Sequence, residues 1–176
     1  MSARLDLRSL TPEMHELSLA GDRRAFGLRL DAEVPEDWPD AREVVQLRLG
    51  QLRDDPALQE WLLRAIVLRE TNEMVGHVGF HAPPGAGYLE EWAPGGVELG
   101  YTVFEHHRRR GYAREAIEAM MAWARQRAGV SRFVVSVTPA NVASRQLADS
   151  LGFVKRGECM DPVDGMEEVL VRESDD

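Results

Sequence analysis

One segment of the chain, residues 97–138, restricts the fold more than any other. Residues 97–104 form an apolar run typical of a strand, 111–128 carry apolar side chains at helical spacing, and 132–138 alternate as a second strand. A strand, a helix and a strand in this order form a crossover, which pairs the two strands in parallel with a right-handed connection. The chain therefore belongs to the α/β class.

Capping residues and periodicity predict the other elements. Thr11 and Pro12 are typical of a helix start, and Gly21 of a helix end. Further elements are expected as a strand over 4–10, a helix capped by Asp40 that runs to about Asp54, hairpin strands over 61–69 and 74–80, a helix from Asn141 to Gly152, and short strands over 153–156 and 167–172. Together they predict an α+β type of fold with a mixed, mostly antiparallel central sheet, one parallel crossover and helices on both faces.

Length and composition favour a single domain. A chain of 176 residues is of ordinary size for one compact domain, which we expect to span 1–176 with a disordered tail at 173–176. The chain contains no uninterrupted apolar run long enough to span a membrane, and its start does not resemble a secretory signal. Its one cysteine, Cys159, cannot form an internal disulfide, which fits a reducing cytoplasm. We expect a cytoplasmic protein, either a monomer or a homodimer.

The net charge of the chain favours some classes of binding partner over others. The formal net charge of −9 would repel a phosphate backbone, so nucleic acid is not an expected partner, whereas a cationic amine would be attracted. Residues 82–96 are rich in proline and glycine and predict a loop, either a solvated connector or part of a binding pocket that includes Tyr88 and Trp92.

The loop before the helix at 111–128 carries an unusual charge pattern. Arg108, Arg109 and Arg110 stand directly before the helix, where the helix dipole disfavours cations. Backbone N–H groups at a helix start bind anions, and arginines around them favour an anion of high charge such as a pyrophosphate. Gly111 would let such a ligand approach the main chain. The alternative from this segment alone is a solvated loop whose arginines pair with surface carboxylates.

These motifs together resemble the GNAT superfamily of acetyl-CoA-dependent N-acetyltransferases. The resemblance joins a strand Glu98-Leu99-Gly100-Tyr101-Thr102-Val103, a loop with the pattern Arg-x-x-Gly-x-Ala at Arg108 to Ala113, and an Asn-x-x-Ser helix that leads to Leu151-Gly152-Phe153. It covers the cofactor-binding core at about 97–153 most strongly. The segment Val34 to Pro39 is similar to the branch that contains the N-terminal acetyltransferases of ribosomal proteins.

The resemblance implies which residues hold the cofactor. The pyrophosphate of acetyl-CoA would be bound by the loop residues, and the pantetheine arm would meet main-chain groups of the preceding strand where a bulge opens it. Asn141 would cap its helix and also contact the cofactor. The implied cofactor contacts are Thr102, Val103, Arg108, Arg109, Arg110, Gly111, Tyr112, Ala113 and Asn141.

Acetyl transfer from a thioester requires a general base and needs only a weak general acid. An amine must lose a proton before it attacks a thioester, because amines are largely protonated at neutral pH. By resemblance Glu98 is the general base, although a strand carboxylate near solvent is the plainer alternative. Ser144 would be the acid, yet a serine at this position is as often only a helix-start residue. The tyrosine that many family members place seven residues after the asparagine is replaced by Ala148.

Several other polar residues lack a matching motif. His106 and His107 are adjacent, without further ligands at a recognised spacing, so no metal is expected. His77 and His81 are either hydrogen-bonded residues of the sheet or lining residues of an amine pocket. Cys159 has no assignable partner for nucleophilic catalysis. The sequence thus predicts acetyl transfer to a small-molecule or peptide amine. A non-catalytic acyl-CoA-binding module and an interaction domain without cofactor are the alternatives.

Overall fold

The computed structural model describes residues 2–163 and 165–174. The strands are β1 (Leu5–Ser9), β2 (Arg64–Leu68), β3 (Met74–Phe80), β4 (Val97–Val103), β5 (Arg132–Val137), β6 (Val154–Asp161) and β7 (Gly165–Glu173). Over the described residues they follow the order β1-β2-β3-β4-β5-β7-β6. Neighbours pair antiparallel in β1–β2, β2–β3, β5–β7 and β6–β7, whereas β4 and β5 pair in parallel. The predicted fold class, mixed and mostly antiparallel with one parallel crossover, is confirmed.

The contacts divide the chain into two compact units, which are described separately. Unit 1 comprises Met1–Gly79 and Tyr101–Ala116, and unit 2 comprises Phe80–Gly100 and Ile117–Asp176. Strand β4 (Val97–Val103) and helix α4 (Tyr112–Ala128) each contribute residues to both units. That 1–176 forms a single domain stays a prediction.

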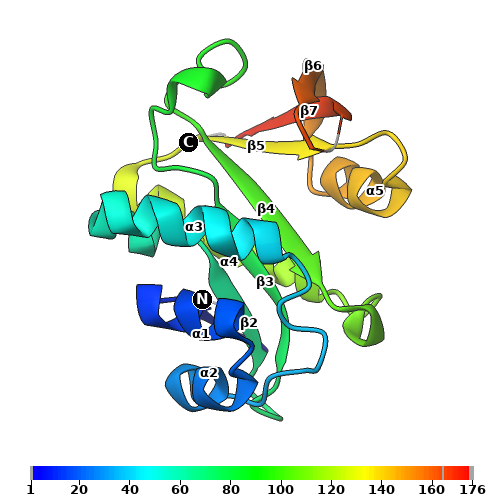
Figure 1. Ribbon diagram of the computed structural model, residues 1–176. Helices are drawn as coiled ribbons and strands as arrows, with labels where there is room; N and C mark the ends of the chain where they lie inside the picture. The colour runs from blue at the N-terminus through cyan, green and yellow to red at the C-terminus, as the bar shows by residue number, and fades with distance from the viewer. Residues whose placement is uncertain (1, 164, 175–176) are drawn as a thin grey trace. The chain divides into compact units, whose positions relative to one another are not determined.

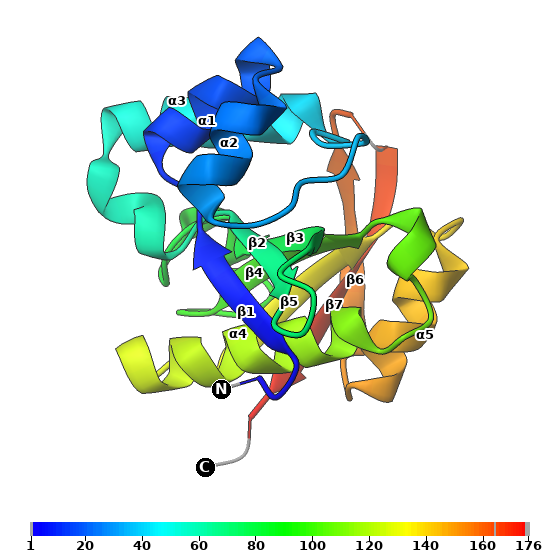
Figure 2. The ribbon, with the colours of Figure 1, turned by 90° about the horizontal axis from the view of Figure 1, so that it is seen from below.

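Unit 1 begins with a strand and three helices whose ends follow local capping. Its elements are β1 (Leu5–Ser9), α1 (Pro12–Ala20), α2 (Arg23–Leu30), α3 (Arg42–Asp54), η1 (Pro56–Glu60), β2 (Arg64–Leu68), β3 (Met74–Phe80) and η3 (Glu105–His107). Thr11 caps α1 by accepting a hydrogen bond from the N–H of Met14, and Gly21 ends it in a left-handed conformation. In Figure 2 the three helices gather on one side of β1 and β2.

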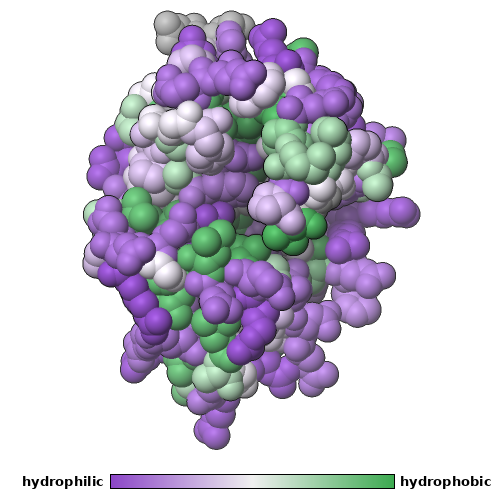
Figure 3. All heavy atoms as spheres, turned by 45° about the horizontal axis from the view of Figure 1, so that its top comes forward, coloured by the Kyte–Doolittle hydropathy of each residue, from purple (hydrophilic) through white to green (hydrophobic). Residues whose placement is uncertain are grey.

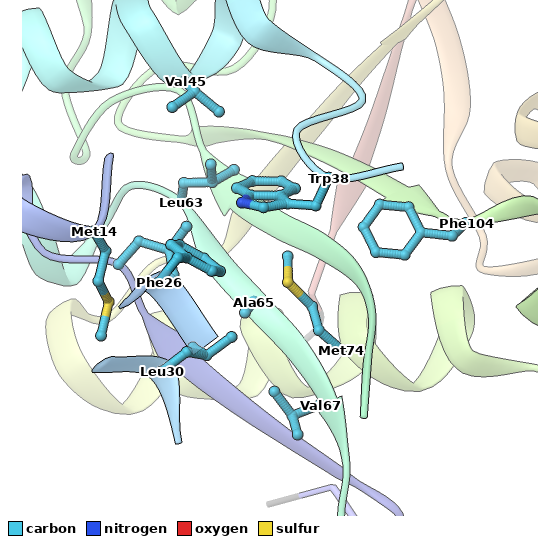
Figure 4. Packing of buried hydrophobic residues seen from close by; sticks show 11 residues of the cluster. Met14, Phe26, Leu30, Trp38, Val45, Leu63, Ala65, Val67, Met74 and Phe104 are labelled. Carbon is cyan, nitrogen blue, oxygen red and sulfur yellow. The ribbon is translucent and has the colours of Figure 1, made fainter. Parts of the chain in front are cut away.

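Trp38 lies at the centre of the hydrophobic core of unit 1. Its ring contacts Phe26 at a centroid distance of 5.5 Å and Phe104 at 6.5 Å. Figure 4 shows these rings among side chains from α1, α2, α3, β2 and β3. Because the helices supply one half of this cluster and the strands the other, burial of the cluster holds the helices on the sheet.

The structure of unit 1 differs from the sequence predictions in three places. Helix α2 was not predicted; Asp22 caps it by accepting from the N–H of Ala25, and Phe26 and Leu30 anchor it in the core. Helix α3 begins after Ala41, which makes no capping bond, and Asp40 instead lies 3.1 Å from Nε2 of His77. The strand predicted from Trp61 starts only at Arg64, because residues 61–63 continue the turn that follows η1.

Unit 2 contains the carboxyl-terminal strands and one helix beside them. Its elements after α4 are β5 (Arg132–Val137), α5 (Val142–Ser150), β6 (Val154–Asp161) and β7 (Gly165–Glu173). Helix α5 lies beside β5 (Figure 1). The last two strands are longer than predicted. The expected tail at 173–176 was wrong at its start, since Glu173 ends β7 and the N–H of Ser174 donates to Ser131; residues 175–176 lie outside the described residues.

The segment 82–96 packs against the sheet of unit 2 and is not a solvated connector. It contains a short turn, η2 (Gly87–Leu89), and it buries Leu89 and Ala93 against valines of β5 and β7. Trp92 lies over Gly157 so closely that a Cβ there would be 2.1 Å from the indole ring. Only glycine therefore fits beneath this side chain.

The surface in view in Figure 3 is largely hydrophilic, with hydrophobic side chains gathered mainly in its central part. Within 2–163 and 165–174, no helix is long and apolar enough to cross a bilayer.

Candidate active site

The arginine-rich loop adopts a conformation suited to binding an anion. Arg109 and Gly111 have φ values of +61° and +81°, and between them and the helix the backbone turns sharply. The N–H of Glu115 donates to the carbonyl of Gly111 at 3.1 Å, which places Gly111 at the start of α4. Amides in the first turn of a helix have no acceptor within the helix and point outward, where they form a site for negative charge.

Arg4 ties this loop to the beginning of β1. Its backbone N–H and its Nε donate to the carboxylate of Glu115 at 2.7 Å, and its Nη1 donates to the carbonyl of Arg110 at 3.0 Å. Its guanidinium lies 4.8 Å from the ring centre of Tyr112. Burial alone would raise the pKa of Glu115, but hydrogen bonds from Ser2 and Arg4 lower it below its ordinary value. Sequence reasoning missed Arg4, because no local pattern links it to a loop so distant in the chain.

The end of β4 was expected to leave main-chain groups of Thr102 and Val103 open to the cofactor. The carbonyl of Val103 accepts from Nε of Arg108 at 3.0 Å, and the cofactor contacts of Thr102 and Val103 stay predictions. At Thr102, strand β3 passes so close that a Cβ on Gly76 would lie 2.1 Å from the carbonyl oxygen. The strand before the loop is therefore held firmly by β3 and by Arg108.

Glu98 is a buried carboxylate held by three donors. It lies in the part of β4 that pairs in parallel with β5 (Figure 1). Oε1 accepts from Oγ of Ser136 at 2.5 Å, Oε2 lies 3.2 Å from Nδ1 of His81, and the Tyr88 side chain supplies a further hydrogen bond. Burial alone would raise the pKa of Glu98, but the bonds from His81, Ser136 and Tyr88, with the charge of His81, lower it below its ordinary value. The carboxylate is thus ionised at neutral pH.

The two histidines of the β3 region have different surroundings. His77 is buried, lies 3.1 Å from Asp40 and contacts the ring of Trp38, so it is a satisfied core residue. His81 contacts Glu98 instead. The sequence predicted His81 only as an alternative residue of an amine pocket. The antiparallel register of β3 and β4 is the signal that would have identified its contact with Glu98.

Cys159 lies on the same part of the sheet as Glu98. Burial raises the pKa of its thiol, and the carboxylates of Glu167 and Glu98 raise it further, whereas a hydrogen bond with Ser136 opposes them. A thiol with a raised pKa carries little thiolate and is a poor nucleophile.

Asn141 and Ser144 form a separate pair at the start of α5. The side chain of Asn141 accepts from the backbone N–H of Ser144 at 3.2 Å, which confirms the predicted helix cap. Ala148, at the position where many family members have a tyrosine, is buried. His107 lies 3.2 Å from Glu73. Among the described residues no group of three or more His, Cys, Asp or Glu could hold a metal ion.

Comparison with known proteins identifies the family. The family model of the acetyltransferase (GNAT) domain matches residues 4–154. The uncharacterized N-acetyltransferase YjdG of Bacillus subtilis is 27% identical over 160 residues, which cover 86% of each chain. A GNAT-family acetyltransferase structure from Bordetella pertussis superposes with a TM-score of 0.68 at 22% identity, covering 98% of this chain and 97% of that one.

Two further solved structures share the fold. The ribosomal-protein-S5-alanine acetyltransferase of Vibrio fischeri has a TM-score of 0.67 at 15% identity, covering 100% of this chain and 96% of that one. The ribosomal L7/L12 α-N-protein acetyltransferase RimL, solved with coenzyme A, has a TM-score of 0.63 at 19% identity, with 98% and 95% covered. The chain belongs to the GNAT acetyltransferase family, and it is an acetyl-CoA-dependent N-acetyltransferase.

Proposed function

We propose that this chain moves an acetyl group from acetyl-CoA to a primary amine, either a protein N-terminus or a small-molecule amine, with Glu98 as the base of the reaction. The observation that carries the proposal is the Glu98 carboxylate, which is buried in the sheet yet kept ionised by donors from three other segments. Direct attack by an amine requires that its proton be removed, and an ionised carboxylate can accept it directly or through a bridging group.

The loop from Arg108 to Ala113 fits the pyrophosphate of the cofactor. Two left-handed residues, Arg109 and Gly111, present the outward amides of the helix start to one anion, and the side chains of Arg109 and Arg110 are exposed beside them. Acetyl-CoA supplies the thioester that the amine attacks. We place its arm along Thr102 and Val103, and a further contact at Asn141.

Ser144 is proposed as the acid that meets the departing thiolate. A thiol ionises near pH 8.5, so a thiolate leaves without a strong acid and a hydroxyl suffices to stabilise it. Asn141 fixes the backbone of Ser144 through the cap of α5, which supports a defined position for that hydroxyl. Ala148 is buried and carries no hydroxyl at the position where many family members have a tyrosine. Ser144 is therefore the candidate acid on this helix.

The acceptor is proposed to be a cationic amine. The net charge of −9 favours the approach of a cation, and the carboxylates of Glu167 and Asp161 add negative charge on the face that carries Glu98. RimL is named for a protein N-terminus, and another structural neighbour, an aminoglycoside acetyltransferase, was solved with ribostamycin and coenzyme A. Both acceptor classes therefore belong in a first screen. A cytoplasmic location and a monomeric or homodimeric state stay predictions.

The test is a screen of amines with acetyl-CoA, read by release of free thiol and by mass spectrometry of the product. The panel contains peptides with free N-termini, polyamines and aminoglycosides. We expect one class to be acetylated, and Glu98→Gln to lower kcat by about 10²–10⁴-fold. Turnover that is unchanged in Glu98→Gln would contradict the assigned base. Acetyl-CoA binding without acetylation of any amine would contradict the proposed acceptor class.

A further inference from the structure

His81 and Glu98 are cross-strand neighbours at the end of β3. The backbone N–H of His81 donates to the carbonyl of Glu98 at 2.8 Å, so the two residues lie opposite each other and their side chains share a face. Nδ1 of His81 lies 3.2 Å from Oε2 of Glu98. An ionised carboxylate can only accept hydrogen bonds, so Nδ1 carries a hydrogen, and in the neutral form of the ring Nε2 carries the lone pair.

The position of the ring depends on Gly100. A Cβ at Gly100 would lie 2.9 Å from Nε2 of His81. Gly100 is the next residue after Glu98 on the same face of β4, in the direction in which the chain proceeds toward the arginine loop. The imidazole therefore extends along β4 from the carboxylate to Gly100.

The two side chains differ in their accessibility to an acceptor. The His81 side chain keeps 40% of its surface exposed, whereas that of Glu98 keeps 8%. Hydrogen bonds from Ser136 and Tyr88 already occupy further lone pairs of the carboxylate. An amine can thus approach the imidazole more readily than the carboxylate behind it.

We infer that His81 is the group that removes the proton from the attacking amine, and that Glu98 acts through it as a positioning residue. This rests on the proposed acetyl transfer, and it moves the direct acceptance of the proton from Glu98 to the imidazole that lies between Glu98 and the amine. Nε2 takes one proton from the amine, and the neutral nitrogen then forms the new bond to the thioester carbon. As the carbon–sulfur bond breaks, CoA leaves as a thiolate and takes up the second proton that the nitrogen loses on becoming an amide. The imidazolium, paired with the Glu98 carboxylate, then releases the first proton to water.

The pH dependence expected from this pair must include its neighbours. Tyr88 from the segment 82–96 and Ser136 on β5 hydrogen-bond to Glu98, and Cys159 on β6 interacts with its charge, while the carboxylates of Glu167 on β7 and Asp161 on β6 act on Cys159. An imidazole base gives kcat/KM an ascending limb near neutral pH, which a carboxylate whose pKa lies below its ordinary value does not. The amine acceptor adds a limb of its own, so the informative quantity is the difference between the wild type and His81→Gln.

The first experiment measures kcat, KM and acetyl-CoA affinity for His81→Gln and Glu98→Gln with the acceptor that the screen identifies. We expect each variant to lower kcat by about 10²–10⁴-fold while the affinity for acetyl-CoA stays unchanged. The limb near neutral pH should disappear in His81→Gln. Full kcat and an unaltered pH profile in His81→Gln, together with loss of activity in Glu98→Gln, would overturn the inference and leave Glu98 as the direct base.

A second variant tests the placement of the ring without removing it. Gly100→Ala should displace the imidazole and lower kcat in the wild type, and it should have little further effect in the His81→Gln background. Gly50→Ala is the matched control, because an added Cβ there meets no atom within 4 Å. Equal losses from Gly100→Ala in both backgrounds would overturn the role of the ring.

A measurement without an acceptor keeps the inference testable if the screen finds none. Nitrogen-15 and proton NMR of the histidine side chains should show His81 with a proton on Nδ1, shifted strongly downfield, and that signal should move in Glu98→Gln. Absence of this signal in the wild type would overturn the inference. If the signal is present but no amine is acetylated, the proposed acceptor class fails and the pairing of His81 with Glu98 stands.

Discussion

Replacing Gly111 with alanine should affect both stability and cofactor binding, and the structure separates the two effects. At φ +81° an L-residue pays about 1–2 kcal/mol relative to glycine, and alanine recovers about 0.4–1 kcal/mol by restricting the unfolded chain. The added Cβ would lie 3.4 Å from Nη2 of Arg4, which is an ordinary contact. The net loss is about 1 kcal/mol, or about 2–4 °C in Tm for a chain of this size.

The effect on binding has a different origin. A Cβ at the start of α4 would stand where an anion approaches the backbone amides, and losing one hydrogen bond to a charged group costs about 1.5–3 kcal/mol. We therefore expect the affinity for coenzyme A to fall by about 10–100-fold. Gly129 provides the matched control: it has φ +65° at the other end of the same helix, and an added Cβ there meets no atom within 4 Å.

Thermal unfolding and calorimetric titration with coenzyme A distinguish the two contributions. Gly111→Ala and Gly129→Ala should lose similar stability, and only Gly111→Ala should lose affinity. If both variants bind coenzyme A as the wild type does, the loop does not hold the pyrophosphate. If both lose affinity equally, the loss reflects general destabilisation and the reasoning from the helix start is refuted.

Three further predictions concern Glu98, Arg4 and Asn141. Hydrogen bonds lower the pKa of Glu98 in the folded chain, so its ionised carboxylate stabilises the fold above the unfolded pKa of about 4.3. This stabilisation is lost as the pH falls through the folded pKa. The difference in unfolding free energy between the wild type and Glu98→Gln, measured by urea unfolding, should therefore shrink below about pH 4. Arg4→Lys keeps the charge but loses the fork that holds Glu115 and Arg110, so coenzyme A affinity should fall several-fold, with less than about 1 kcal/mol of stability lost. Asn141→Ser should keep the helix cap and the stability that Asn141→Ala loses, about 1 kcal/mol, while both variants weaken coenzyme A binding if the amide contacts the cofactor.

Much of the fold could be predicted from short-range patterns. Thr11, Gly21 and Asn141 act as helix boundaries through their own side chains or backbone conformation, so the sequence alone locates them. Helix α2 was missed because Gly27 and the few apolar residues around it give a weak helical pattern. It depends on the Asp22 cap and on the burial of Phe26, which only the tertiary structure supplies.

The candidate site was predicted in part for the same reason. The arginine loop and Glu98 belong to motifs of neighbouring residues that the sequence shows directly. The residues that contact them lie elsewhere in the chain. His81 meets Glu98 through strand register, and Arg4 meets Glu115 across more than a hundred positions. Neither pairing follows from spacing alone, because register is set by the whole sheet.

The neighbours of Glu98 show that stability does not explain its placement. The adjoining face of the sheet is lined by Val134, Val169 and Val171, which are buried and need no hydrogen-bond partner. A charged group in such a place costs free energy that hydrogen bonds only offset, and an apolar residue of similar size is often as stable or more so. Here donors from the segment after β3, from the segment 82–96 and from β5 converge on one carboxylate. We attribute this arrangement, in which three donors keep one carboxylate ionised beside an accessible imidazole, to the proton transfer proposed for this position.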